Sequence, residues 1–142
     1  TRSSWRQRAP SQRDSPAPVR VGMPTLVDTS VWVDHFRTDS LELRHLLEHD
    51  LVMCHPLVIG ELACGNMKRR SEALGSLAML PTTPTVEYDE LLTFIETHKL
   101  SGQGLGWIDV HLLASAVLDG VTLWTRDQSL RNAAKKLRCD FD

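Results

Sequence analysis

Four acidic residues are the strongest candidates for chemistry in this sequence, and two of them follow segments expected to be strands. Asp28 and Asp127 each come at the end of a short apolar run. Acids at the carboxyl ends of parallel strands meet at one edge of a sheet, where open α/β folds bind their ligands. Helix capping is the alternative use of an aspartate at such a position, and it explains either residue equally well when taken alone.

Glu61 and Asp109 are harder to assign to a structural role, because each interrupts the apolar face of an expected helix. Glu61 follows Leu57 and Val58 by one turn, and Asp109 precedes Leu112 by one turn. Burying an unpaired carboxylate is costly, so these positions call for a cation, a metal or a buried hydrogen-bond network. No lysine or arginine is spaced to meet either acid on its own helix. A shared divalent ion is therefore the favoured partner.

A cluster of carboxylates defines the kind of metal and the kind of reaction to expect. Oxygen ligands select Mg²⁺ or Mn²⁺ over zinc. One or two such cations remove the repulsion between the acids and activate a water for attack on a phosphodiester. Ser30 and Thr125, near the two strand ends, are candidates to orient a carboxylate or a metal-bound water, although local capping also explains each hydroxyl.

The elements that must position these acids alternate between apolar strands and amphipathic helices. Strands are expected at residues 25–28, 51–54 and 121–125, and residues 81–86 read as a loop with a short strand. Helices are expected in two segments across 30–49 and at 56–66, 68–79, 88–100, 107–119 and 128–137. Strands separated by helices indicate βαβ units, so we predict an α/β fold with a mainly parallel sheet.

Composition suits one domain that buries a core without disulfides. The chain has 142 residues, of which 42% are hydrophobic and 24% charged. No apolar run approaches the roughly 20 residues of a membrane span, and no signal-peptide layout is present. The three cysteines include no Cys-x-x-Cys pair and are expected to be reduced thiols. These features predict a cytoplasmic protein that does not associate with membranes.

Charge is distributed unevenly along the chain. Residues 1–22 hold five arginines and one aspartate, together with three prolines, and are expected to form a flexible arm or to be a remnant of an expression vector. The domain is expected to span residues 23–142, where eleven Lys and Arg stand against seventeen Asp and Glu. This acidic balance argues mildly against a generic nucleic-acid binder, so any such contact must be local.

The order of the acids and their surroundings resembles a known family. Leu-Val-Asp-Thr-Ser-Val-Trp at 26–32 is followed by Glu61 in a helix, Asp109 at the start of a later helix, and Leu-Trp-Thr-Arg-Asp at 123–127. This ordered set resembles PIN-domain ribonucleases, and among them the VapC-type toxins of bacterial toxin-antitoxin pairs, over residues 24 to about 140. No single motif is specific, but the ordered set is.

The resemblance implies a PIN-like three-layer α/β/α domain with a mainly parallel central sheet. It implies an endoribonuclease that uses Mg²⁺ or Mn²⁺, forms a homodimer and is restrained by a small antitoxin protein. By similarity, Asp28, Glu61, Asp109 and Asp127 are the catalytic, metal-binding acids, with Asp28 and Asp109 the most dependable metal contacts. Arg126, beside Asp127, is the basic residue singled out as an RNA contact.

Other functions remain as alternatives. A PIN nuclease of RNA processing, a structure-specific DNA nuclease and a catalytically inactive protein-binding module share the same acids. A phospho-receiver module needs paired acids after its first strand, where Thr29 follows Asp28, and a lysine after the last. A haloacid-dehalogenase phosphatase needs a second aspartate where Ser30 stands. Trp32, Trp107 and Trp124 are interpreted as packing residues, although base stacking stays open for Trp107 beside the Gly-rich stretch.

Overall fold

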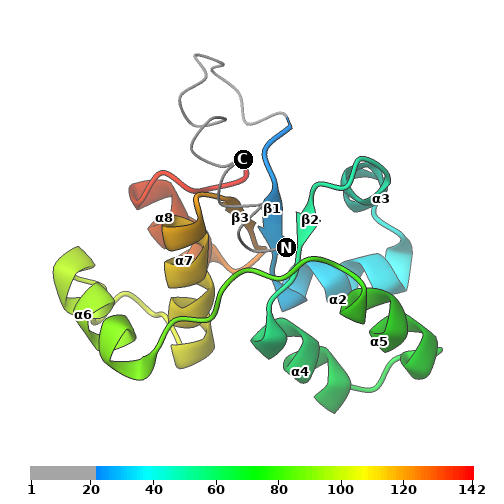
Figure 1. Ribbon diagram of the computed structural model, residues 1–142, viewed down its shortest axis with the longest axis horizontal. Helices are drawn as coiled ribbons and strands as arrows, with labels where there is room; N and C mark the ends of the chain where they lie inside the picture. The colour runs from blue at the N-terminus through cyan, green and yellow to red at the C-terminus, as the bar shows by residue number, and fades with distance from the viewer. Residues whose placement is uncertain (1–21) are drawn as a thin grey trace.

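The computed structural model describes residues 22–142, and a three-stranded parallel sheet lies at the centre of this region (Figure 1). The strands are β1 (Thr25–Val27), β2 (Val52–Met53) and β3 (Thr122–Trp124), in the order β2-β1-β3. All three were predicted, each one or two residues longer. The expected arm, residues 1–22, lies outside the described residues apart from Gly22.

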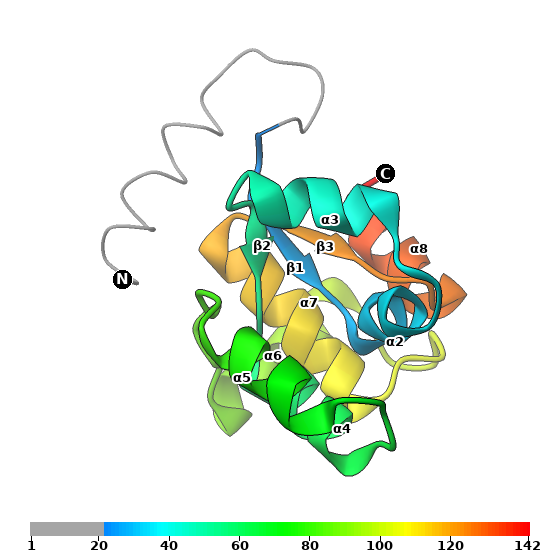
Figure 2. The ribbon, with the colours of Figure 1, turned by 90° about the vertical axis from the view of Figure 1, so that its right-hand side faces the viewer.

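Seven helices accompany the sheet within residues 22–142. They are α2 (Thr29–Thr38), α3 (Leu41–Glu48), α4 (Pro56–Cys64), α5 (Arg70–Ala78), α6 (Tyr88–His98), α7 (Trp107–Asp119) and α8 (Gln128–Lys136). Helices α6, α7 and α8 gather on one side of the sheet and α2 to α5 on the other (Figures 1 and 2). The predicted α/β fold and its three layers are confirmed.

Burial explains why the strands read as apolar runs rather than as alternating patterns. Every residue of β1, β2 and β3 is buried, as in parallel sheets covered by helices on both faces. Leu26 and Leu123 are register partners across β1 and β3, and both are almost fully buried with Leu113 of α7. Burying a leucine side chain of this kind contributes about 1.5–3 kcal/mol to stability.

Local signals fix where the helices begin and end. Pro56 is the first residue of α4, and the preceding His55 caps the helix by accepting a 3.0 Å hydrogen bond at Nδ1 from the Leu57 amide. Burial, reinforced by the neighbouring His111, lowers the pKa of His55 to about 4, so the neutral ring is available as an acceptor. Gly120, at φ 71°, ends α7 in the left-handed conformation before β3.

The segments at which prediction and structure differ are short. Residues 81–86 contribute one parallel bridge, Cys54 to Thr82, and no strand, since Pro81 and Pro84 lack the N–H group that a ladder requires. A bridge between Leu123 and Asp140, which was not predicted, brings the chain after α8 back to β3. Within residues 22–142 no helix is long and apolar enough to cross a membrane.

Candidate active site: a cluster of four carboxylates

Strands β1 and β3 end side by side, and each passes directly into a helix that an aspartate caps. The Asp28 amide donates to the Trp124 carbonyl at 2.9 Å, which joins the two strand ends. Asp28 is the N-cap of α2, and Asp127 is the N-cap of α8 through a 2.9 Å bond from the Leu130 amide to Oδ2. Asp28 and Asp127 therefore both cap helices and lie at the carboxyl edge of the sheet, so the two alternatives considered from the sequence are both true.

Asp28 is the most firmly held acid of the four. It is 7% exposed, and its Oδ1 accepts from the Thr29 amide at 2.7 Å. Its Oδ2 accepts from the Thr125 hydroxyl at 2.7 Å and from the Ser30 hydroxyl at 3.0 Å. The structure thus places both hydroxyls that were singled out in the sequence directly on the Asp28 carboxylate.

The same two hydroxyls connect Asp28 to the residues after β3. Thr125 Oγ1 accepts from the Asp127 amide at 3.0 Å, and Ser30 Oγ accepts from the Arg126 amide at 3.0 Å. Each hydroxyl has one proton, and that proton is donated to Asp28. The 3.5 Å contact between the two hydroxyl oxygens is therefore a close approach without a donated proton. This network fixes Asp28 relative to the start of α8.

Glu61 of α4 contacts Thr29, a residue that was not among the site candidates predicted from the sequence. Its Oε1 accepts a 2.7 Å hydrogen bond from the hydroxyl of Thr29. Glu61 is exposed, however, whereas the sequence placed it on a core-facing stripe. Fewer residues of α4 are buried than its apolar composition indicated, since only Val58 and Leu62 are classed as buried. The signal for Thr29 is its position directly after the strand-end aspartate.

Asp109 completes the cluster from the first turn of α7. Its Oδ2 accepts from the Gly106 amide at 2.9 Å, and the residue is partly buried. Burial raises the pKa of this carboxyl, the charges of Asp127, Asp28 and Glu61 raise it further, and the Gly106 bond opposes them. Asp127, Asp28 and Glu61 thus each disfavour the charged form of Asp109.

The acids form an open cluster. Within residues 22–142, no three His, Cys, Asp or Glu side chains are arranged closely enough to hold a metal ion as they stand. No Lys, Arg or His of this region forms an ion pair with any of the four acids. Arg126 instead contacts Asp34 at 2.6 Å, with its guanidinium 5.9 Å from the Trp124 ring centroid. The carboxylates thus repel one another with no ion-paired cation from residues 22–142.

Replacing Thr125 with valine tests the hydroxyl network. Valine keeps the shape and removes the proton that Thr125 donates to Asp28 and the oxygen that accepts from Asp127. We expect a stability loss of about 1–3 kcal/mol in urea denaturation, because the partners are buried. Stability equal to that of the parent would mean that the Asp28 carboxylate does not depend on the Thr125 hydroxyl.

The Gly-rich loop before α7 brings Asp109 toward Asp127. Gly104 has φ +80°, and a Cβ atom built there would lie 2.8 Å from the hydroxyl oxygen of Ser129 in α8. The loop therefore packs against the first turn of the helix that Asp127 caps. A side chain at Gly104 would force the Ser129 hydroxyl to move and would strain the backbone at this positive φ.

A pair of glycine substitutions checks this contact. Gly104→Ala is expected to destabilise the protein by about 1 kcal/mol or more, through backbone strain and the clash with Ser129. Gly75→Ala is the matched control, since Gly75 lies inside α5 with no atom within 4 Å of an added Cβ. That change should stabilise by about 0.5–1 kcal/mol. Equal urea midpoints for the two variants would contradict the close packing of the loop.

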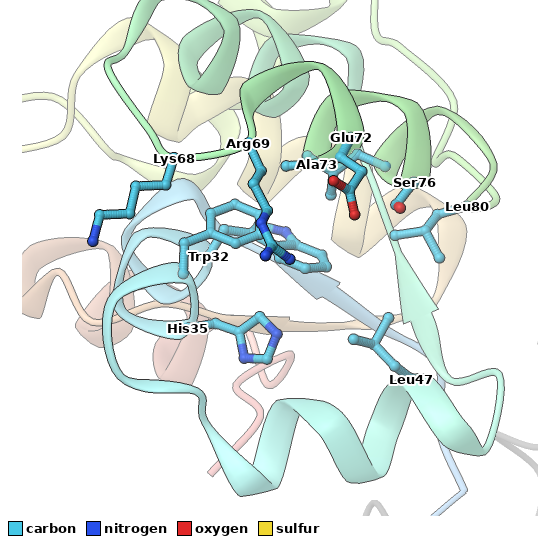
Figure 3. A pocket seen from close by; sticks show the side chains of 11 residues that line it. Trp32, His35, Leu47, Lys68, Arg69, Glu72, Ala73, Ser76 and Leu80 are labelled. Carbon is cyan, nitrogen blue, oxygen red and sulfur yellow. The ribbon is translucent and has the colours of Figure 1, made fainter.

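A separate groove lies between α2, α3 and α5, away from the acids. Its volume is about 640 Å³, and none of the four acids lines it. Trp32, His35 and Leu47 lie on one side, and side chains of α5 and the preceding loop, among them Arg69, lie on the other (Figure 3). Its lining is mostly apolar and also includes Lys68, Arg69 and Glu72. It is a second surface of the domain, distinct from the carboxylate cluster.

Comparison with known proteins agrees with this architecture. The family model described as the PIN domain matches residues 25–136. The chain belongs to the PIN domain family. This PIN domain is 48% identical over 109 residues to ribonuclease VapC32 from two strains of Mycobacterium tuberculosis, covering 76% of this chain and 88% of the relative.

A solved structure shares the fold of this PIN domain. The crystal structure of PAE2754 from Pyrobaculum aerophilum matches with a TM-score of 0.54 and 16% sequence identity. The match covers 82% of this chain and 90% of that one. At this identity the likeness shows the fold alone. The family and fold predicted from the sequence are confirmed.

Proposed function

We propose that this PIN domain is a metal-dependent endoribonuclease and the toxin of a toxin-antitoxin pair. Its 48% identity to a protein named ribonuclease VapC32 supports RNA as the substrate. The observation that carries the proposal is the hydrogen-bonded junction after β1 and β3, where Thr125 and Ser30 hold Asp28, Thr29 holds Glu61 and Asp127 caps α8. Burial and the charges of these acids raise the pKa of the Asp109 carboxyl. Four mutually repelling carboxylates beside a sheet edge are suited to phosphodiester hydrolysis with a divalent cation.

The residues present fit Mg²⁺ or Mn²⁺. All four side chains offer carboxylate oxygens, which these cations prefer. In Glu61, Asp109 and Asp127 one oxygen accepts a hydrogen bond, and the other accepts none from residues 22–142. When bound, the cation would neutralise the cluster, polarise the phosphodiester and acidify a water. Asp28, Glu61, Asp109 and Asp127 would hold it.

The chain's own groups orient these acids. Thr29 holds Glu61, and Thr125 with Ser30 holds Asp28, so neither carboxylate is free to turn away. Asp28, Asp109 and Asp127 lie in the first turns of α2, α7 and α8 or cap them. The positive ends of three helix dipoles therefore offset part of the repulsion among the acids, each by about 0.3–1 kcal/mol.

Arg126 is the basic residue that we propose contacts the RNA backbone. It follows β3 and lies directly before Asp127 in the chain. Its partner Asp34 is about as exposed as Arg126, with 43% and 48% of their side chains accessible. Exposed ion pairs of this kind contribute only about 0–1 kcal/mol, so a phosphate can compete for the guanidinium.

The test is cleavage of single-stranded RNA by the purified chain. We expect cleavage with Mg²⁺ or Mn²⁺, none with EDTA, and a loss of about 100-fold or more in Glu61→Gln. Glu48→Gln, an exposed position in α3, is the matched control and should behave like the parent. Undiminished cleavage in EDTA, or in Glu61→Gln, would refute the mechanism. Preferential cleavage of DNA would favour a different PIN nuclease.

The proposed role as the toxin of a toxin-antitoxin pair is tested by bacterial growth. Expression in a bacterial host is expected to arrest growth, and a small antitoxin protein should relieve the arrest. The apolar groove between α2, α3 and α5 offers a surface for an apolar segment of that partner. We also expect a homodimer, which light scattering would detect. Growth arrest that persists in Glu61→Gln would argue that toxicity does not come from cleavage.

A further inference from the structure

The three tryptophans in the described region are not alike. Trp32 and Trp124 are 3% and 4% exposed, as expected for core residues. Trp107 is 43% exposed, although it begins a helix whose other large apolar residues are mostly inside. The interpretation of all three as packing residues therefore fits two of them. Trp107 is not exposed singly, because the exposed ring of Tyr88 lies beside it, and an exposed patch of large side chains is informative about binding.

The angles between neighbouring aromatic rings also distinguish Trp107 from Trp32 and Trp124. The Trp124 ring stacks on Phe141 with centroids 4.5 Å apart and planes 21° apart, and Trp32 stacks on Phe36 at 25°. Trp107 meets His111 at 87° and Tyr88 at 55°. No ring of residues 22–142 lies flat on its indole. The indole is thus held by tilted neighbours and lacks the stacked partner that the other two tryptophans have.

The position of Trp107 relates this exposed ring to the acids. Trp107 and Asp109 are the first and third residues of α7, so helix geometry puts their Cα atoms within about 5.5 Å. Asp109 is anchored by the amide of Gly106, the residue before Trp107. Tyr88, the first residue of α6, is 65% exposed with its ring 5.8 Å from the indole. An exposed aromatic pair therefore lies at the helix start that carries Asp109, with the Trp107 ring on the face of α7 that also carries His111.

The charges around the pair indicate which part of a nucleic acid it suits. Glu87 precedes α6, and Asp89 and Glu90 lie in its first turn, all of them exposed. These acids repel a phosphate, so the pair is unsuited to the RNA backbone. The uncharged face of a base meets no such repulsion. Aromatic side chains stack on bases of single strands, since paired bases keep their faces inside the duplex.

We propose that Trp107, with Tyr88 beside it, stacks an unpaired RNA base next to the phosphodiester on which the four acids act. This rests on the proposed ribonuclease function and adds to it a requirement for an unstacked nucleotide at a fixed distance from the cleaved bond. Trp107 then binds substrate and takes no part in bond breaking. Stacking also predicts tolerance of base identity, because every base has a flat face.

The test measures RNA binding and cleavage by the parent, Trp107→Ala and Trp107→Phe. The substrates are a fluorescent single-stranded RNA and a series of copies of it, each lacking one base. In the parent, removal of one base near the cleaved bond should weaken binding about 10-fold. Trp107→Ala should bind the intact RNA about 10-fold more weakly than the parent, seen as a higher KM with an unchanged kcat. Removal of the same base should not weaken binding by this variant further. Trp107→Phe should recover most of the affinity. Leu118→Ala, an exposed apolar position at the far end of α7, is the matched control.

Each other outcome has a definite meaning. An abasic penalty that persists in Trp107→Ala, or an unchanged KM, overturns the stacking role while leaving the ribonuclease proposal intact. A KM change that tracks a change of oligomeric state in light scattering overturns it in favour of a contact between copies of this chain. If no RNA is cleaved, fluorescence anisotropy with Mg²⁺ still measures RNA binding. Weaker binding at one abasic position in the parent but not in Trp107→Ala supports stacking, and equal binding of the intact RNA by parent and variant refutes it.

Discussion

Replacing Asp109 with asparagine is expected to abolish RNA cleavage and, in the same protein, to raise the stability of the metal-free fold. Asparagine can still accept the hydrogen bond from Gly106, so the first turn of α7 stays capped. The change removes a carboxylate that burial and three neighbouring acids disfavour in its charged form. With screening by solvent taken into account, the gain is up to about 1 kcal/mol, or about 4 °C in Tm. Cleavage should fall about 10³-fold or more.

The pH dependence of stability follows from the direction of the shift. A carboxyl whose pKa is higher in the folded state binds its proton more tightly there than in the unfolded chain, so stability falls as pH rises above the ordinary value of 3.8 toward the raised one. The metal-free parent should show this loss, and Asp109→Asn should not. At neutral pH, Mg²⁺ at about 100 times its Kd should return about 2.7 kcal/mol to the parent and little to the variant.

Thermal unfolding with and without Mg²⁺ between pH 4 and 8, at roughly constant ionic strength, measures both effects. Asp89→Asn, which removes an exposed acid of α6, is the control for a change in net charge. If Asp109→Asn were less stable than the parent without metal, Asp109 would be stabilising the fold and the repulsion inferred here would be wrong. If the variant gained as much from Mg²⁺ as the parent, the cation would bind elsewhere.

Substitutions of Asp28 should separate its two roles. Asparagine is as good an N-cap as aspartate, so Asp28→Asn should keep the bond from the Thr29 amide and cost about 1 kcal/mol for the altered contacts with Thr125 and Ser30. Asp28→Ala loses the cap and leaves the Thr125 hydroxyl buried without its acceptor, at a cost of about 2–4 kcal/mol. RNA cleavage should fall about 10³-fold in both variants, despite their different stabilities.

Urea denaturation and cleavage rates on the same samples test this separation. Asp28→Asn with cleavage within about tenfold of the parent, a barrier change of about 1.4 kcal/mol, would reduce Asp28 to a helix cap. Equal stability of the two variants would contradict the hydrogen-bond network seen around its carboxylate. Asp127, the N-cap of α8, can be compared with Asp28 in the same protein. Asp127 is exposed, and its carboxylate accepts one hydrogen bond, from the Leu130 amide, whereas the buried Asp28 carboxylate accepts three.

Most of the fold could be predicted because local and tertiary signals agree along this chain. Pro56 and Gly120 mark helix ends by backbone chemistry alone, and α7 begins and ends at the predicted residues. The strands are short apolar runs between turn signals, which is how fully buried parallel strands read. The Leu123 to Asp140 bridge could not be predicted, because it depends on where the chain lies after α8 and not on any local pattern.

The four acids could be proposed as candidates from the sequence, whereas their surroundings could be predicted only in part. Asp28 and Asp127 could be placed at one sheet edge from strand order alone. Glu61 was chosen as a buried acid and is exposed, since periodicity gives the side of a helix but not how much of it a neighbour covers. Thr29 was missed as a site residue, because its bond to Glu61 spans 32 positions and only the fold brings the two together.

The arrangement of Trp107 shows the same limit. Its neighbours in the sequence gave no means of telling an exposed indole from a buried one. Exposure and ring angles distinguish it from Trp32 and Trp124, and both depend on the packing of α6 against α7. Sequence patterns therefore identify the acids that we propose for the chemistry and leave base stacking open for Trp107, whereas the exposure of its indole is seen only in the three-dimensional structure.

The central claim, that the four acids share a divalent cation, is tested most directly by a crystal structure of the protein grown with Mn²⁺ and measured for anomalous scattering. We expect an anomalous peak within the cluster, bound by Asp28 and Asp109 at about 2.0–2.3 Å, with Glu61 and Asp127 contacting the ion directly or through water. A fully occupied Mn²⁺ elsewhere on the domain, or an unoccupied cluster at saturating Mn²⁺, would contradict the account.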